Sequence, residues 1–224
     1  MIPPRLVNDR KDPEARWIAE LAARLKLQTP PDFRPPSSPQ LSYGRHQGPP
    51  QFNARQAAVL LCCMVDSQGE WSIPLVVRAE QHGHHAGQIA FPGGKLDPGE
   101  TPREAALREF FEEMGVSVES DEVVGQLPPT FVFASNFQVH SFVAVTTRPV
   151  AWYPSPDEVA EVLELPLLRL FDPAAYGQHP ITRRGLQFSA PHLEFQGHYI
   201  WGATLRILGQ LAQCLCAEIK IIQR

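Results

Sequence analysis

The stretch from Thr101 to Gly115 constrains the fold most, because it carries start and stop signals for one helix. Thr101 is a suitable N-cap, Pro102 suits the first helical position, and Glu104 completes a T-x-x-E capping box. Gly115 can take the left-handed conformation that ends a helix. The sequence therefore predicts a helix from about Pro102 to about Met114.

The predicted helix has an apolar stripe and a carboxylate face, since successive residues turn by about 100°. The stripe expected to face the core consists of Leu107, Phe110, Phe111 and Met114. Roughly opposite lie Glu109, Glu112 and Glu113, with the small Ala105 and Ala106 one turn earlier. Carboxylates within one turn repel each other, so the cluster favours a hard divalent cation that takes oxygen ligands. The alternative is a solvated acidic face, which is common on amphipathic helices.

Apolar runs and helical patterns mix along the rest of the chain. The runs that predict strands are 57–65, 71–77, 123–127, 139–146 and 193–200. Residues 13–27 and 201–217 have helical character. This order lacks the regular alternation of a doubly wound parallel sheet, so we expect an α/β fold with a mixed sheet.

A proline-rich stretch separates the first predicted helix from the rest of the chain. Seven prolines between residues 28 and 50 exclude a regular helix or a central strand there. We interpret the stretch as an extended linking segment rather than a docking motif. The predicted organisation is an N-terminal helix and extended segment over 1–50, followed by one catalytic domain with a C-terminal helix over 51–224.

The net charge and the composition of the chain restrict the classes of partner that it is expected to bind. The formal net charge of −4 disfavours a general nucleic-acid or anionic-membrane binder, and no run is long and apolar enough for a membrane span. The N-terminus shows no apolar signal core, and the four cysteines lack a C-x-x-C spacing. We expect reduced thiols in a cytoplasmic protein that acts on a small molecule, and the sequence leaves its oligomeric state open.

The predicted helix and the loop before it resemble the Nudix box: Gly, five residues, Glu, seven residues, then Arg-Glu, a bulky apolar residue, any residue, Glu-Glu, any residue, Gly and a bulky apolar residue. The matching positions are Gly94, Glu100, Arg108, Glu109, Phe110, Glu112, Glu113, Gly115 and Val116. The family usually carries an aliphatic residue where Phe110 stands. The resemblance implies an α/β/α sandwich in which a loop–helix–loop holds Mg²⁺ or Mn²⁺ beside a substrate diphosphate.

The resemblance also implies roles for individual residues. Glu109 and Glu113 would be the main metal ligands, and the Gly94 backbone would approach the metal closely. Glu112 would be a further ligand or the base that activates water. Two catalytic residues would act on these groups: Arg108 would hold the glutamates in place, and Glu100 would bind metal through water or stabilise the loop.

The segment before the box, GQIAFPGG at residues 87–94, resembles the coenzyme A pyrophosphatase branch of the Nudix family. Arg78 and Ala79 fit that branch, as do the segments EVAE at 158–161 and YIWGAT at 199–204. Gly83 stands where the branch carries a second arginine. Three nearby histidines, His82, His84 and His85, are interpreted as a phosphate-contacting or solvated loop rather than a transition-metal site.

The resemblance implies hydrolysis of coenzyme A or acyl-coenzyme A to a 4′-phosphopantetheine-type product and adenosine 3′,5′-bisphosphate. Arg78 and Lys95 are the candidates to bind substrate phosphates, with Arg78 the first candidate for the 3′-phosphate. The alternatives are a Nudix hydrolase for ADP-ribose or a nucleoside triphosphate, and an inert Nudix module that senses a nucleotide. An inert module would be expected to lack box glutamates, and all of them are present.

Overall fold

A computed structural model describes residues 13–27, 50, 52–66, 69–79, 87–146, 151–183 and 185–215. The predicted proline-rich segment, apart from Pro50, and the three histidines at 82–85 lie outside these residues. In chain order, the elements are α1 (Pro13–Leu27), β1 (Arg55–Val65), β2 (Trp71–Arg78), β3 (Ile89–Ala90), β4 (Gly93–Lys95), α2 (Pro102–Met114), η3 (Ser120–Glu122), β5 (Val123–Val132), β6 (Phe137–Thr146), β7 (Val159–Pro166), η4 (Leu167–Phe171), η5 (Pro173–Ala175), β8 (Tyr176–Arg183), β9 (Leu186–Phe195), β10 (His198–Trp201) and α3 (Gly202–Leu215).

Seven of the described strands form one mixed sheet, in which β1 is the central strand. The order is β3-β2-β1-β6-β5, with β4 also paired to β1 and β7 to β2. β1 and β6 run parallel, whereas the other pairs in this sheet are antiparallel. Strands β8, β9 and β10 form a separate antiparallel sheet. The prediction of an α/β/α sandwich with a mixed sheet is confirmed.

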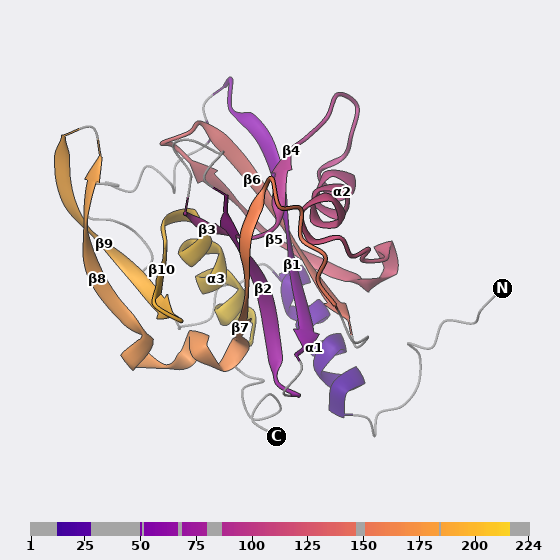
Figure 1. The fold of residues 1–224 in the computed structure, drawn as a ribbon. Coiled ribbons are helices and arrows are strands. Elements are labelled where there is room, and N and C mark those ends of the chain that lie inside the picture. The colour runs from indigo at the N-terminus through magenta and orange to yellow at the C-terminus, as the bar shows by residue number, and fades with distance from the viewer. Residues whose placement is uncertain are drawn as a thin grey trace.

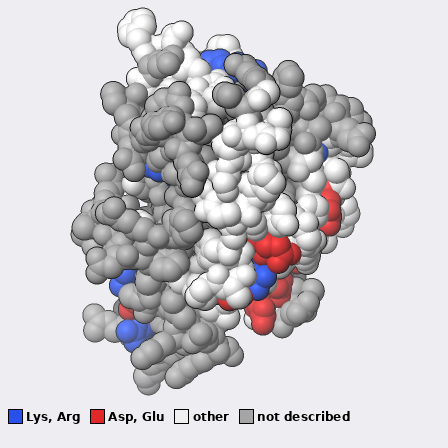
Figure 2. All heavy atoms as spheres, turned by 90° about the vertical axis from the view of Figure 1, so that its left-hand side faces the viewer, with Lys and Arg blue, Asp and Glu red and all other residues white. Residues whose placement is uncertain are grey.

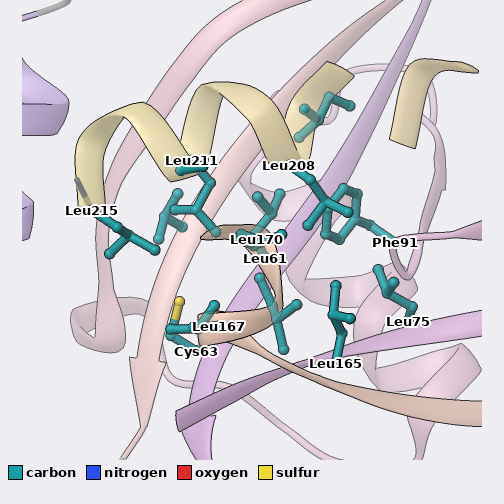
Figure 3. Packing of buried hydrophobic residues seen from close by; sticks show 14 of the residues in the cluster. Leu61, Cys63, Leu75, Phe91, Leu165, Leu167, Leu170, Leu208, Leu211 and Leu215 are labelled. Atoms are coloured by element: carbon teal, nitrogen blue, oxygen red, sulfur yellow. The ribbon is translucent and has the colours of Figure 1, made fainter. Parts of the chain in front are cut away.

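The helices cover the main sheet on both faces, so each face has its own core (Figure 1). On one face α2 packs through Phe110 and Met114 against β1 and β6. On the other face α1 and α3 pack over β1, β5 and β6. Figure 3 shows Leu208, Leu211 and Leu215 of α3 directed at the sheet. Alternate residues of β1 therefore point into different cores, which explains its nearly continuous apolar sequence.

The predicted N-terminal helix is confirmed, and it belongs to the same core as the sheet. Trp17, Leu21 and Leu25 recur at helical spacing and are all buried. Leu25 lies so close to Gly125 of β5 that a β-carbon at that glycine would be 2.7 Å from Leu25 Cβ. The helix thus covers part of the main sheet instead of standing apart from it.

The strand predictions are confirmed for β1, β2, β5 and β6, which all extend beyond the predicted ranges. The predicted run 193–200 is instead the turn region of a hairpin, because Gln196 and Gly197 have positive φ values of 52° and 81° and reverse the chain between β9 and β10. Sequence patterns missed β7 and β8. Charged or polar residues interrupt both strands, so they lack the apolar alternation that identifies a strand.

None of the described helices has the length and apolarity to cross a bilayer. Figure 2 shows one face on which the described acidic side chains gather in one area with basic side chains beside them.

Candidate active site

Helix α2 begins and ends as its sequence predicts. The Thr101 hydroxyl accepts from the Glu104 amide, and the Glu104 carboxylate accepts from the Thr101 amide at 2.8 Å. Gly115 ends the helix in the left-handed region with φ of 67°, and its amide donates to the Phe111 carbonyl at 2.8 Å. The helix is thereby fixed at both ends, which fixes the carboxylates along its length.

The buried face of α2 differs from the predicted stripe. Phe110 and Met114 are buried as predicted, but Phe111 is 52 % exposed, so its assignment to the core is wrong. Ala105 and Ala106, predicted on the open carboxylate face, are fully buried against the sheet. The buried face is rotated by roughly 90° from the apolar stripe, at about 100° per residue.

This rotation has a chemical consequence. It carries Glu113 into the seam between α2 and the sheet, where only 4 % of the residue is exposed. The small alanines let the helix approach the sheet closely, because no larger side chain separates the two. The helix therefore buries carboxylate instead of maximising apolar burial, which is the pattern expected where function sets the packing.

Two glycines of β4 make room for the carboxylates. A β-carbon at Gly94 would overlap the carboxylate of Glu109, and one at Gly93 would overlap the carbonyl of Ala58 on β1. The Gly93 amide donates to Glu113 Oε2 at 3.1 Å. Only glycine permits this close approach of backbone and carboxylate.

Arg108 connects the box residues. Its guanidinium makes a two-pronged contact with Glu100, at 2.8 Å to Oε1 and 2.9 Å to Oε2. It also donates to Glu109 Oε1 at 3.0 Å and Glu112 Oε2 at 2.9 Å. A further bond of 3.1 Å reaches the Lys95 carbonyl, which ties α2 to β4. The predicted positioning role of Arg108 thus has a direct geometric basis, because one planar cation holds three carboxylates.

The carboxylates differ in electrostatic environment. Burial raises the pKa of Glu113 to about 7, although Arg78 and the Gly93 amide act in the opposite direction. Burial also raises the pKa of Glu109. The Arg108 hydrogen bond lowers the pKa of Glu100. The protein alone therefore stabilises the ionised forms of Glu109 and Glu113 poorly, and a cation beside them would favour ionisation.

The two predicted phosphate-binding residues lie on either side of the glycines. Arg78 Nη2 donates to the Gly93 carbonyl at 3.2 Å and lies 3.9 Å from Glu113 Oε1. Lys95 is exposed at the end of β4. Arg78 is thus held within the carboxylate site, while the Lys95 side chain is directed to the surface.

Glu158 is a residue of this site that the sequence pattern did not single out. Its charge raises the pKa of both Glu109 and Glu113, so its carboxylate lies in their neighbourhood. Its carbonyl accepts from the Ala79 amide at 3.0 Å, which sets it beside Arg78. The sequence offered one signal, the EVAE segment, but no pattern connected that segment with a helix more than forty residues earlier.

The loop that carries Glu158 is docked on the end of α2. The Tyr153 amide donates to the Met114 carbonyl and the Ser155 amide donates to the Glu113 carbonyl, both at 3.0 Å. A β-carbon at Gly115 would overlap the Tyr153 carbonyl. These contacts use helix carbonyls that have no partner within the helix. Gly115 therefore both ends α2 and admits the loop.

The donor set fits a hard divalent cation. Glu109, Glu112, Glu113 and the backbone at Gly94 offer oxygen donors, and the first and third carboxylates are partly desolvated. As the side chains stand, no three acidic, histidine or cysteine side chains among the described residues converge closely enough to hold one ion. Since Arg108 engages Glu109 and Glu112, binding a cation requires a change of rotamer there.

Comparison with known proteins agrees with this geometry. The NUDIX domain model matches residues 54–185, which include the whole carboxylate site. The chain belongs to the Nudix hydrolase family. It is 34 % identical over 203 residues to a Nudix hydrolase NudL of Pectobacterium atrosepticum, covering 89 % of this chain and 95 % of that protein. It is 36 % identical over 162 residues to NudL of Salmonella paratyphi B, covering 72 % of this chain and 83 % of that one.

The Nudix fold is also seen among solved structures. A MutT/nudix family protein from Enterococcus faecalis superimposes with a TM-score of 0.52 at 15 % identity, covering 89 % of this chain and 74 % of that one. The present chain is accordingly a Nudix hydrolase, a pyrophosphatase acting on phosphorus-containing anhydrides, and enzymes of this family generally use divalent metal ions. The box assignment from sequence is confirmed at the level of the family.

Proposed function

We propose that the protein hydrolyses the diphosphate of coenzyme A or an acyl derivative. One observation supports a substrate that is more specific than the family assignment. The two segments that resemble the coenzyme A branch, GQIAFPGG and YIWGAT, meet in the fold: the Thr204 hydroxyl of α3 donates to the Ile89 carbonyl of β3 at 2.8 Å in a buried position. Segments more than a hundred residues apart thus build one structure directly beside Gly93 and Gly94.

The proposed cation is Mg²⁺ or Mn²⁺, held by Glu109 and Glu113 with Glu112 or the Gly94 backbone. When bound, such an ion polarises a phosphoryl oxygen and lowers the pKa of an attacking water. The raised pKa of Glu113 supports this assignment, because a buried carboxylate gains most from a nearby cation.

The surrounding residues are proposed to position these groups and the substrate. Arg108 fixes the glutamate rotamers, and Glu100 fixes Arg108 through its paired hydrogen bonds. Glu112, with half of its side chain exposed, is available to accept the proton of the attacking water. Arg78 and Lys95 are proposed to bind phosphate. Because Arg78 lies at the Gly93 carbonyl and near Glu113, we assign it to the diphosphate instead of the 3′-phosphate for which the resemblance made it the first candidate.

A matched set of substrates tests the proposal. Coenzyme A, dephospho-coenzyme A and ADP-ribose share an adenosine diphosphate portion, so their kcat/KM values with Mg²⁺ or Mn²⁺ measure recognition of the remainder. We expect coenzyme A or its acyl derivatives to be cleaved fastest. Arg78→Ala should weaken coenzyme A and dephospho-coenzyme A about equally. Rapid cleavage of ADP-ribose with coenzyme A intact would refute the substrate and leave the family assignment unchanged.

A further inference from the structure

The chain from Ile89 to Lys95 occupies an opening between β1 and β2. Direct pairing of these two strands is confined, in the described part of the chain, to two residue pairs beside the turn that joins them. Farther along, β3 pairs with β2 and β4 pairs with β1 instead. The segment that leads to Gly93 therefore crosses from one strand to the other, and its position depends on how β3 is held.

The carbonyl of Ile89 in β3 points away from β2. Ile89 lies opposite Val77, and the neighbouring Arg78 amide donates to the Gln88 carbonyl at 3.0 Å. Hydrogen-bonded and non-hydrogen-bonded pairs alternate along an antiparallel ladder, so the backbone groups of Ile89 face away from β2. Among the described strands, β2 alone pairs with β3. Because Ile89 is only 7 % exposed, its carbonyl needs a partner from another element.

Helix α3 supplies that partner. The hydroxyl of Thr204, in the first turn of α3, donates to the Ile89 carbonyl at 2.8 Å, and Thr204 is only 8 % exposed. The next residue, Leu205, and Leu208 are fully buried in the core beneath α3, so the helix is a firm support. Since β3 is two residues long, this bond is a substantial part of what holds the strand in place.

Strand β3 in turn holds the end of β2 that carries Arg78. The Arg78 amide donates to the Gln88 carbonyl, and the Gly87 amide donates to the Arg78 carbonyl at 2.9 Å. The Arg78 guanidinium then reaches the Gly93 carbonyl at 3.2 Å. Contacts therefore continue without a break from α3 through β3 to the arginine beside the carboxylates.

We propose that Thr204 is a positioning residue for substrate binding. Its hydroxyl holds β3, and through β3 it holds the Arg78 side chain where that side chain contacts the substrate diphosphate. The inference rests on the phosphate contact that the proposed function gives to Arg78. It does not depend on which diphosphate compound is the substrate.

The glycine end of the same segment has supports of its own. Phe91 is buried in the core that includes Leu208 of α3 (Figure 3). The Pro92 carbonyl accepts from the Leu60 amide at 3.1 Å, and Gly93 and Gly94 pair with β1. The carboxylate site is therefore fixed by β1 and α2 independently of Thr204. Loss of the Thr204 hydroxyl should weaken substrate binding and leave cation binding intact.

Steady-state kinetics with the diphosphate substrate that the protein cleaves fastest test this role. Thr204→Val keeps the shape of the side chain and removes the donor. We expect KM to rise about fivefold, as for the loss of one buried hydrogen bond. In contrast, kcat should change by less than about twofold, because a contact made equally in ground and transition states affects KM alone. Thr204→Ser keeps the hydroxyl and should restore the wild-type KM.

Two controls separate positioning from general stability. The affinity for Mn²⁺, measured by electron paramagnetic resonance without substrate, should be the same in Thr204→Val and in the wild type. Thr130→Val removes another buried threonine hydroxyl, one on β5 without a hydrogen-bond partner, and should leave KM and kcat unchanged. A Thr204→Val protein with a lower Tm but a wild-type KM would show a structural role only and overturn the proposal.

A double-mutant cycle with Arg78 tests the route. In an Arg78→Ala background, Thr204→Val should raise KM little further, because the group that Thr204 positions is absent. Additive effects on KM would overturn the route through Arg78. An unchanged KM in Thr204→Val, with a raised KM in Arg78→Ala, would overturn this inference and leave the proposed function standing. An unchanged KM in Arg78→Ala would refute the proposed phosphate contact and the inference with it.

Discussion

The seam between α2 and the main sheet differs from the core on the other face of that sheet, beneath α1 and α3. In the first, Arg108 joins Glu100, Glu109 and Glu112 by hydrogen bonds, and the excess is negative charge in a desolvated seam. In the second, α1 and α3 bury apolar side chains such as Leu21, Leu208 and Leu211 against the sheet. The first face leaves negative charge for a cation to balance, whereas the second contributes chiefly apolar burial, so function sets the packing of α2 and stability sets most of the packing of α1 and α3.

The largest expected effect concerns the carboxylate site. Glu109→Gln and Glu113→Gln should each lower kcat by about two to four orders of magnitude, because each removes a charged oxygen ligand while keeping the shape. Steady-state assays at saturating Mg²⁺ or Mn²⁺ measure this. Glu70→Gln, an exposed residue in the turn before β2, is the control and should retain activity. Full activity of Glu113→Gln would remove the basis for the metal assignment.

The orientation of α2 gives the next prediction. Phe110→Ala should cost about 3–5 kcal/mol of unfolding free energy, since the ring is fully buried. Phe111→Ala, at the adjacent exposed position, should change it by less than about 0.5 kcal/mol. Urea denaturation of both variants measures the difference. Equal losses of unfolding free energy in the two variants would support the buried stripe predicted from the sequence and contradict the observed rotation of the helix.

Those two phenylalanines show what the sequence could and could not predict. The helix bounds, the Arg108 and glutamate positions and the four main strands followed from local signals, because caps, turns and box spacing are encoded by near neighbours. The rotation of α2 did not, since Ala105 and Ala106 look unremarkable until the sheet packs on them. Glu158 was missed for the same reason: its neighbours come from elements far away in the chain.

Stability of the metal-free protein should depend on the buried glutamate. The folded pKa of Glu113 is about 7 against an ordinary value of 4.5, so the native state binds more protons than the unfolded state between these values. The contribution of Glu113 to the free energy of unfolding is therefore fully present below pH 4.5 and is lost as the pH rises through about 7. The loss is about 3 kcal/mol for such a shift.

The matched variant isolates that contribution. In EDTA, Glu113→Gln should lack this part of the pH dependence and be more stable than wild type above pH 7. Denaturant titrations between pH 5 and pH 8 measure the two curves. Parallel curves for the two proteins would show that Glu113 ionises normally in the fold.

A smaller effect tests the docking of the Glu158 loop. Gly115→Ala should cost about 1–3 kcal/mol, from the left-handed backbone and from overlap with the Tyr153 carbonyl, and it should lower activity by displacing the loop. Gly197→Ala introduces a similar positive φ of 81° with open space around it, so it should show the backbone cost alone. Thermal melts and kcat of both variants measure this. Equal activity of the two variants would show that the position of the Glu158 loop does not affect catalysis.

We propose that this Nudix hydrolase cleaves the diphosphate of coenzyme A or an acyl derivative. The most direct measurement is product identification by mass spectrometry after incubation of the protein with coenzyme A and Mg²⁺ or Mn²⁺, with Glu113→Gln as the blank. We predict equal amounts of 4′-phosphopantetheine and adenosine 3′,5′-bisphosphate, with neither formed by the variant. Intact coenzyme A, under conditions in which the same protein cleaves ADP-ribose or a nucleoside triphosphate, would contradict the claim.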